Sequence, residues 1–145
     1  MKWLLPFMFL FAACLKDKLS PEAALKDFVE TRFGHVVTRQ FILEHVTGKM
    51  KQSLENISEE EFQKFSDLRN VKNDSFKVLS KSCQEKMCYL TYSISYRTSK
   101  DDKPTAASEV KKIAELHLVE GKWLIEDVSN VKTYHEVLEP IEPLQ

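Results

Sequence analysis

Glycine is scarce in this chain of 145 residues, and its three glycines (Gly34, Gly48 and Gly121) lie far apart. A phosphate-binding loop needs glycines close together, so the sequence excludes a glycine-rich loop of that kind. An excess of one charge is also missing, because 21 Lys and Arg residues stand against 22 Asp and Glu residues, for a net charge of -1. Nucleic-acid binding needs surplus positive charge to neutralise phosphates, so this near-balance argues against a nucleic-acid partner.

Large apolar side chains are plentiful. Hydrophobic residues make up 43% of the chain, which contains 9 Phe, 4 Tyr and 2 Trp. A disordered chain would be poorer in such residues, so we expect a packed core. The length fits one domain and leaves little room for a second.

The first fourteen residues have the pattern of an export signal. Lys2 provides a positive start, residues 3–11 form an apolar run that only Pro6 interrupts, and Ala12-Ala13-Cys14 follows. A cationic start, a short apolar stretch and small residues before a cleavage site are the three parts of a secretory signal. At about 1.5 Å per residue, the apolar stretch falls short of the roughly 30 Å hydrocarbon core of a bilayer.

The segment Leu10-Phe11-Ala12-Ala13-Cys14 resembles the lipobox of bacterial lipoproteins, in which a signal peptidase cuts before a lipid-modified cysteine. The two alanines and the cysteine match the motif, whereas Phe11 stands where the family usually has Leu. The alternative is an ordinary cleaved signal in which Cys14 has no role. Conventional cleavage after Ala13 would place the bulky Phe11 where a small residue is favoured, so the lipoprotein interpretation is preferred.

This resemblance implies that residues 1–13 are a lipoprotein signal peptide and that residues 14–19 are a lipidated tether. Cys14 would carry thioether-linked lipid, and usually an amide-linked acyl chain such as palmitate as well. Two or more acyl chains make a membrane anchor effectively permanent. Leu15, rather than Asp, follows the cysteine. In a Gram-negative cell the resemblance therefore favours the outer membrane, with the domain facing the periplasm or the surface.

The sequence predicts helices in the N-terminal part of the domain, before the strands. Ser20 can cap a helix that has Pro21 at its first position, and Gly34 is a plausible stop for it. A second helical segment begins near Thr38, with apolar residues at four-residue intervals. Thr47-Gly48 is its weak point, where the segment bends or splits.

A third helix has the clearest start, because Ser58 and Glu61 form a capping box. Negative charge at residues 59–61 is already favourable against the helix dipole, so this acidic cluster needs no cation to explain it.

Strands follow. Residues 88–97 alternate apolar and polar side chains, as a half-buried antiparallel strand requires. Residues 76–79 predict a shorter preceding strand, and residues 113–120 and 122–128 predict a hairpin. Residues 99–104 are polar and are interpreted as a loop.

Helices followed by four strands predict an α+β fold in residues 20–138, with N-terminal helices packed on one face of a curved four-stranded antiparallel sheet. Residues 139–145 contain two prolines and predict an irregular tail. The element order, the capped helix at Ser58 and the closing hairpin with Gly121-Lys122-Trp123 resemble small bacterial lipoproteins with a nuclear transport factor 2-like (cystatin-like superfamily) domain. The resemblance implies a cone-like architecture. Because members of that superfamily include enzymes and binding proteins, the fold leaves activity open.

Two cysteines bracket the first predicted strand turn. Cys83 and Cys88 would face each other across a four-residue hairpin loop, close enough for a disulfide. An exported chain meets an oxidising compartment, where such a bond persists. The alternatives are two reduced thiols or a redox pair, although redox pairs usually lie closer together at a helix start.

Metal and catalytic sites have weak support. The four histidines (His35, His45, His117 and His135) do not have the spacing of a zinc site, so we predict no metal and no cofactor. Ketosteroid isomerases, which have the resembled fold, use a pocket carboxylate as a base. Asp127 would take that role here if it shared a strand face with Trp123 and Ile125, beside Tyr92 or Tyr96.

The leading functional hypothesis is a lipid-anchored envelope protein with a non-catalytic binding or structural role. Its partner would be another envelope protein or a small apolar ligand. The alternative is a ligand-binding or isomerase-like enzyme. A deep cavity with a buried carboxylate would support this alternative, whereas a core filled by aromatic side chains would support a binding or structural module. The aromatic side chains concerned are Phe28, Phe76, Tyr92 and Trp123.

Overall fold

The computed structural model describes residues 20–138. In this range helices precede strands, and the strands form one antiparallel sheet in the order β1-β2-β3-β4. The helices are α1 (Pro21–Arg32), α2 (Arg39–Leu43), α3 (Gly48–Asn56) and α4 (Glu59–Ser66). The strands are β1 (Val71–Gln84), β2 (Met87–Lys100), β3 (Lys103–Val119) and β4 (Lys122–Val137). The predicted α+β order is confirmed.

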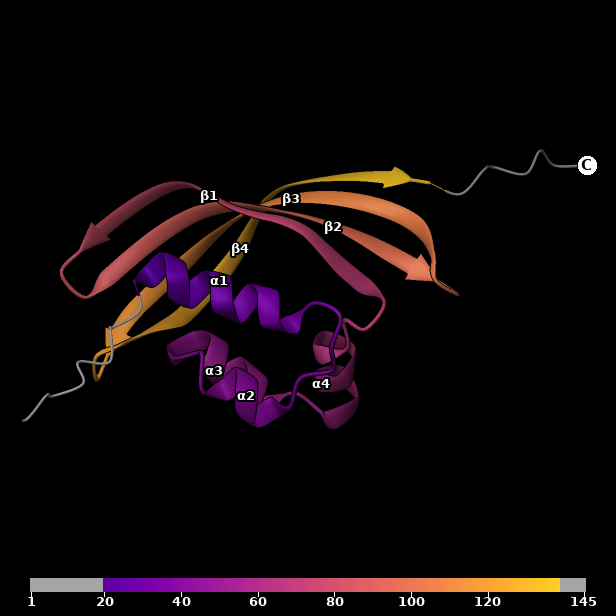
Figure 1. Ribbon diagram of the computed structural model, residues 1–145. Helices are drawn as coiled ribbons and strands as arrows, with labels where there is room; N and C mark the ends of the chain where they lie inside the picture. The colour runs from indigo at the N-terminus through magenta and orange to yellow at the C-terminus, as the bar shows by residue number, and fades with distance from the viewer. Residues whose placement is uncertain (1–19, 139–145) are drawn as a thin grey trace, which may run out of the picture.

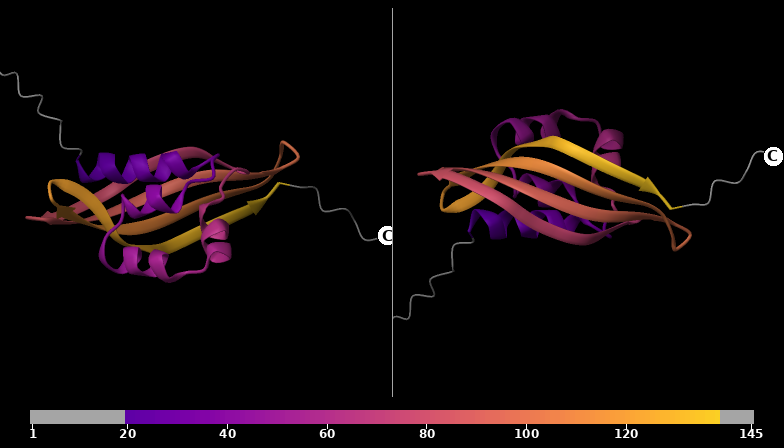
Figure 2. Two further views of the ribbon diagram at one scale, coloured as in Figure 1. Left: turned by 90° about the horizontal axis from the view of Figure 1, so that it is seen from below. Right: turned by 90° about the horizontal axis from the view of Figure 1, so that it is seen from above.

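The sheet arches over the helices. Figure 1 shows α1 beneath the arch, with α2, α3 and α4 further below it. Figure 2 shows that the described helices lie against one face of the sheet and leave the other face uncovered. The core therefore lies between the concave face and the helices, and the C-terminal part of β4 extends beyond this helical layer.

The predicted helix starts at Ser20 and Ser58 are confirmed. The Ser20 hydroxyl accepts a hydrogen bond from the backbone N–H of Ala23, at 3.1 Å. Ser58 and Glu61 form the reciprocal capping box, in which the Glu61 carboxylate also accepts from the Ser58 backbone N–H, at 3.0 Å. These side chains satisfy amide groups that have no partner within the helix.

The second predicted helix is split, as the weak point at Thr47-Gly48 suggested. Helix α2 ends at Leu43 and α3 begins at Gly48, and the segment between them pairs with β4. The Thr47 backbone N–H donates to the carbonyl of Ile125 at 2.8 Å, and the Ile125 N–H donates to the carbonyl of His45 at 2.9 Å. Hydrogen bonds to the sheet therefore replace those of a continuous helix.

The strands are longer than predicted, and the polar loop predicted at residues 99–104 is wrong. Ser99 pairs with Pro104 and Lys100 with Lys103, so only Asp101 and Asp102 form the turn. The hairpin loop between the cysteines is likewise shorter than predicted, because Gln84 pairs with Met87.

The strand ends were missed because they lack alternating large apolar residues. Inward positions of β3 before residue 113 include Ala106, Ser108 and Lys112, and residues 129–137 of β4 are all exposed. Backbone pairing dominates at these ends, and it leaves no alternating pattern in the sequence.

Candidate functional site

A cleft of about 580 Å³ lies between the helices and the concave face of the sheet. Its walls are mainly apolar: Phe28, Val29, Met50, Phe65, Ile94 and Val110 contribute from both layers. No Asp or Glu belongs to its lining, all of which lies within residues 20–138. This volume and apolar character are typical of small-molecule pockets.

The aromatic residues expected to fill the core divide between core and cleft. Phe28 and Tyr92 are buried, and each also forms part of the cleft wall. Phe76 packs against Tyr92, with ring centroids 5.5 Å apart, and Trp123 is partly buried against the core. Phe76 and Trp123 do not line the cleft, so aromatic side chains fill only part of the space beneath the sheet and the rest remains a cleft.

Arg32 enters the cleft from α1. It shares a helix face with Leu25, Phe28 and Val29, which are buried. Its Nη2 donates to the carbonyl of Phe65 at 3.1 Å, and its guanidinium lies 4.3 Å from the centroid of the Phe65 ring. Its buried Nε has no hydrogen-bond partner among residues 20–138.

The charge of Arg32 is retained at neutral pH despite burial. Burial lowers the pKa of the guanidinium to about 10, because the charged form loses hydration, and the nearby Tyr92 phenol partly offsets this shift. Within the described residues Arg32 forms no ion pair with a carboxylate. The cleft therefore contains a positive charge that no acidic side chain of this part of the chain balances.

Lys112 enters the same cleft from the sheet. On β3 it is two residues from Val110 and two from Ala114, which are 4% and 0% exposed. Residues two apart on a strand share a face, so the Lys112 side chain leaves the strand on the inward face. Its neighbours across the sheet are Tyr92 on β2 and Asn130 on β4, which also line the cleft.

Two effects lower the pKa of the Lys112 ammonium. Burial removes water from the charged form, and the positive charge of Arg32 repels it. Within residues 20–138 the Lys112 ammonium forms no ion pair with a carboxylate. Arg32 and Lys112 thus form an uncompensated cationic pair in an otherwise apolar cleft, and sequence reasoning missed it. The available signal was a basic residue at an inward position of each element.

Asp127, the pocket carboxylate that the isomerase-like alternative requires, does not lie in the cleft. Glu115 and Leu116 on β3 pair with Asp127 and Ile125, so Glu126 is an extra residue that forms a β-bulge. The bulge interrupts the alternation: Ile125 faces the core at 2% exposure, whereas Asp127 is exposed and lies outside the cleft lining. Its carboxylate accepts a hydrogen bond from the Val128 backbone N–H.

The two cysteines predicted to form a disulfide lie together on neighbouring strands. Cys83 and Cys88 are bonded, directly opposite each other in the β1–β2 register, with Cα atoms 4.0 Å apart. Cys14, the signal peptide at residues 1–13, the tether at residues 14–19 and the tail at residues 139–145 lie outside the described residues.

Three of the four described histidines have ordinary structural partners for their rings. His45 Nδ1 lies 2.7 Å from the carbonyl of Phe41, and His117 Nε2 lies 2.8 Å from the carboxylate of Glu115. His135 Nδ1 lies 2.8 Å from the Ser108 hydroxyl on the neighbouring strand. Residues 20–138 contain no group of three or more His, Cys, Asp and Glu side chains placed to hold a metal ion.

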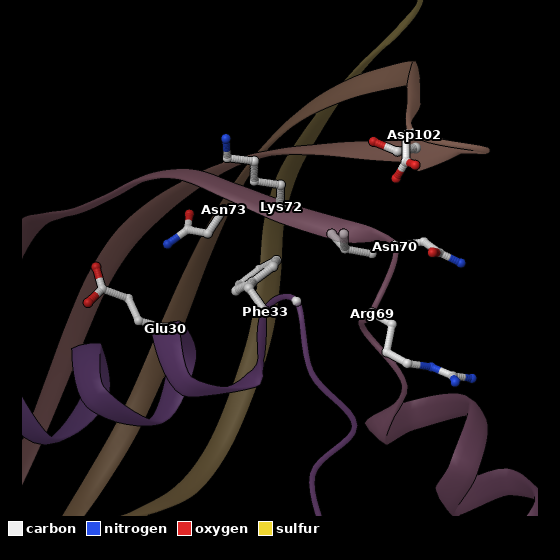
Figure 3. Close-up of a pocket in the computed structure, with 10 residues that line it drawn as sticks. Glu30, Phe33, Arg69, Asn70, Lys72, Asn73 and Asp102 are labelled. Carbon is white, nitrogen blue, oxygen red and sulfur yellow. The ribbon is translucent and has the colours of Figure 1, made fainter.

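A second hollow, of about 430 Å³, lies beside the end of α1 (Figure 3). Figure 3 shows Glu30 and Arg69 on opposite sides of Phe33, with Lys72 and Asp102 above. These charged side chains are exposed and of both signs, and Arg69 is bound to Asp67 through two hydrogen bonds, at 2.9 and 2.6 Å. This hollow therefore has fewer features that could select a ligand than the cleft has.

No protein-family model matches the chain, and no curated protein sequence matches it significantly. Among solved structures, a SEC-C motif-containing protein from Rhodopseudomonas palustris is similar, with 13% sequence identity and a TM-score of 0.48. The similarity covers 75% of this chain and 70% of that chain. In the part of the chain that the structure describes, no helix has both the length and the apolar character needed to cross a bilayer.

Proposed function

We propose that this chain is a lipid-anchored envelope lipoprotein whose domain binds a small apolar ligand without catalysing a reaction on it. The observation that carries the binding role is the apolar cleft of about 580 Å³ between the helices and the sheet. An isomerase-like mechanism loses its expected base, because Asp127 lies outside this cleft. A binding role needs an apolar enclosure and a few polar groups.

The anchor rests on the lipobox-like segment ending at Cys14. Metabolic labelling with palmitate tests it: the native chain should incorporate label and enter the detergent phase of a Triton phase split. The Cys14→Ser variant should lose both properties, because its hydroxyl cannot form the thioether. Label that persists in Cys14→Ser would contradict the anchor, as would a native protein that begins at Met1. Fractionation of labelled membranes tests the outer-membrane location.

We also propose that the domain has the cone-like architecture of nuclear transport factor 2-like domains. A nuclear transport factor 2-like cone has a strongly curved sheet wrapped around a long helix. The position of α1 beneath an arched sheet supports this assignment (Figure 1). An experimentally determined structure tests it, because a sheet that does not curve around α1 would contradict the cone.

Ligand binding is tested with the uncharged apolar fluorophore N-phenyl-1-naphthylamine. The whole chain carrying Cys14→Ser is used, so that no attached lipid competes for the cleft. We expect saturable binding with a rise in fluorescence, because the fluorophore moves from water to an apolar pocket.

Two tryptophan substitutions locate the bound fluorophore. Met50→Trp fills the cleft from α3 and should abolish saturable binding, since Met50 lines the cleft. Val131→Trp, at a position on β4 that is 50% exposed and outside the lining, should leave binding unchanged. Equal binding by both variants would contradict the cleft as the site. Absence of saturable binding in the parent would favour a structural or protein-binding role instead.

A further inference from the structure

We propose that the ligand of this cleft is an amphiphile with one carboxylate head and an alkyl chain, and that Arg32 and Lys112 recognise the head. This inference rests on the ligand-binding function proposed above and specifies its chemistry. Arg32 comes from α1 and Lys112 from β3, and both line the same cleft without an acidic neighbour in its lining.

The first argument is the cost of the two charges. Cations that are withdrawn from water are normally paired, because dehydration without a partner is unfavourable. Within residues 20–138 neither side chain has an ion pair, and the buried Arg32 Nε lacks a hydrogen-bond acceptor. A bound anion would supply the missing countercharge to both.

The second argument is that the charge of Lys112 is not needed for packing. Phe28 and Val29 already provide the buried face of α1, and Val110 and Ala114 provide that of β3. An apolar residue at position 112 would continue the alternation of β3 and avoid the dehydration of an ammonium group. The lysine therefore has a physical rationale as part of a binding site and none as part of the core.

The third argument concerns the match between the groups and the head. The planar guanidinium suits a carboxylate, and an ammonium group adds a point charge with rotatable donors. The phenol of Tyr92, whose pKa is raised by burial, remains a neutral hydroxyl beside Lys112 in the sheet register. The apolar walls formed by Phe28, Met50 and Phe65 suit the alkyl chain.

Displacement of N-phenyl-1-naphthylamine tests the inference in the whole Cys14→Ser chain. Dodecanoate, dodecanol and dodecyltrimethylammonium share one chain length and differ in the charge of the head. The two ions are used below their critical micelle concentrations, and dodecanol is used below its solubility limit. We expect dodecanoate to displace the fluorophore at a concentration at least tenfold lower than dodecanol, and dodecyltrimethylammonium to be the weakest competitor.

Substitutions assign the preference to the cationic pair. Lys112→Met and Arg32→Gln should each reduce the dodecanoate-to-dodecanol preference severalfold while dodecanol still competes. Lys111→Met is the matched control, because the neighbouring Lys111 is exposed and outside the cleft lining. It removes the same formal charge and should leave the preference unchanged. Lys112→Met keeps the test decisive even where Arg32→Gln disturbs packing, since methionine suits an inward strand position.

The failures are distinguishable. Saturable fluorophore binding with equal displacement by dodecanoate and dodecanol would overturn the carboxylate inference and leave the apolar ligand site intact. A preference that Lys112→Met and Lys111→Met reduce equally would also overturn it, because net charge rather than the cleft would then be responsible. Absence of fluorophore binding in the parent chain would overturn the ligand-binding function itself.

Discussion

Gly48 lies directly against the carboxylate of Glu126: a Cβ added at Gly48 would overlap Glu126 Oε2. The other carboxylate oxygen accepts a hydrogen bond from the Lys49 backbone N–H, at 3.1 Å. Thr47, the N-cap residue of α3, makes no side-chain hydrogen bond to this helix. Glu126, the bulge residue of β4, therefore caps α3 from the sheet.

The Gly48→Ala substitution should destabilise the domain. Gly48 has φ +48°, where an alanine is strained, and its added Cβ would displace the Glu126 carboxylate. We expect a loss of about 1–2 kcal/mol in the free energy of unfolding, as measured by urea titration. Gly34→Ala is the control, because Gly34 also has a positive φ of +76° but an added Cβ would have no atom within 4 Å. An equal loss in both variants would show that the contact with Glu126 contributes nothing.

Removal of the cap should have a similar effect. Glu126→Ala leaves the Lys49 N–H without its acceptor and should cost about 0.5–2 kcal/mol of stability, the range of a lost N-cap. Glu136→Ala, at an exposed position on the same strand, should have little effect on the urea midpoint. A Glu126→Ala midpoint equal to that of Glu136→Ala would refute the capping role. In the Glu126→Ala background, Gly48→Ala should cost less than in the parent, because only strain remains.

The sequence predicted what local chemistry determines. Ser20 and Ser58 were identified as caps because a hydroxyl and its acceptor lie within one turn, and β2 was found because its inward residues are large and apolar. The bulge at Glu126 has no local signature, since it depends on how β4 pairs with β3. Because of that single extra residue, Asp127 lies outside the cleft, and the isomerase-like alternative lacks its base.

The cationic pair in the cleft was missed for a related reason. Arg32 and Lys112 are 80 positions apart (112 − 32) and line one cleft only because α1 packs beneath the sheet that contains β3. Each residue alone resembles an ordinary surface charge. The shared site is identified only when the inward position of each residue on its own element is combined with the packing of the helix against the sheet.

The Cys83–Cys88 disulfide should keep both cysteines from being alkylated and should stabilise the β1–β2 hairpin. In protein isolated without reductant, neither cysteine should be alkylated, and both should react after reduction and unfolding, as read by peptide mass spectrometry. For so short a closed loop, reduction should cost about 2 kcal/mol of stability in the chain-entropy account. Urea titration of the oxidised and reduced protein measures this difference, and alkylation of both thiols without reductant would contradict the bond.

An ion pair between α1 and β1 should make part of the stability depend on pH. Lys81 Nζ donates to Glu22 Oε1 at 2.6 Å, and this hydrogen bond lowers the pKa of the Glu22 carboxyl below its usual value near 4.5, partly offset by burial. Because the folded pKa is the lower one, the contribution is fully present above the unfolded pKa. It is lost as the pH falls through the folded pKa.

The Glu22→Gln variant should therefore lose stability at neutral pH by at most about 1 kcal/mol, since the pair is partly exposed. Below pH 4.5 the difference from the parent should shrink, because the parent carboxyl becomes protonated as well. Urea titrations across the acid range measure this convergence. Lys81→Met should show the same trend, and a difference that stays constant down to the folded pKa would refute the linkage.

Lys112→Met should stabilise the domain while it weakens the proposed carboxylate site. The ammonium is partly buried without a partner in residues 20–138, and its lowered pKa reflects the cost of its dehydration and its repulsion by Arg32. An inward methionine removes both costs and buries more apolar surface beside Val110. We expect a gain of about 0.5–2 kcal/mol in the free energy of unfolding, the size of other single stabilising substitutions. Lys111→Met, on the uncovered face, should change stability little. A loss of stability in Lys112→Met would show that the lysine is part of the folded core, and its role as a residue kept for binding would then be wrong.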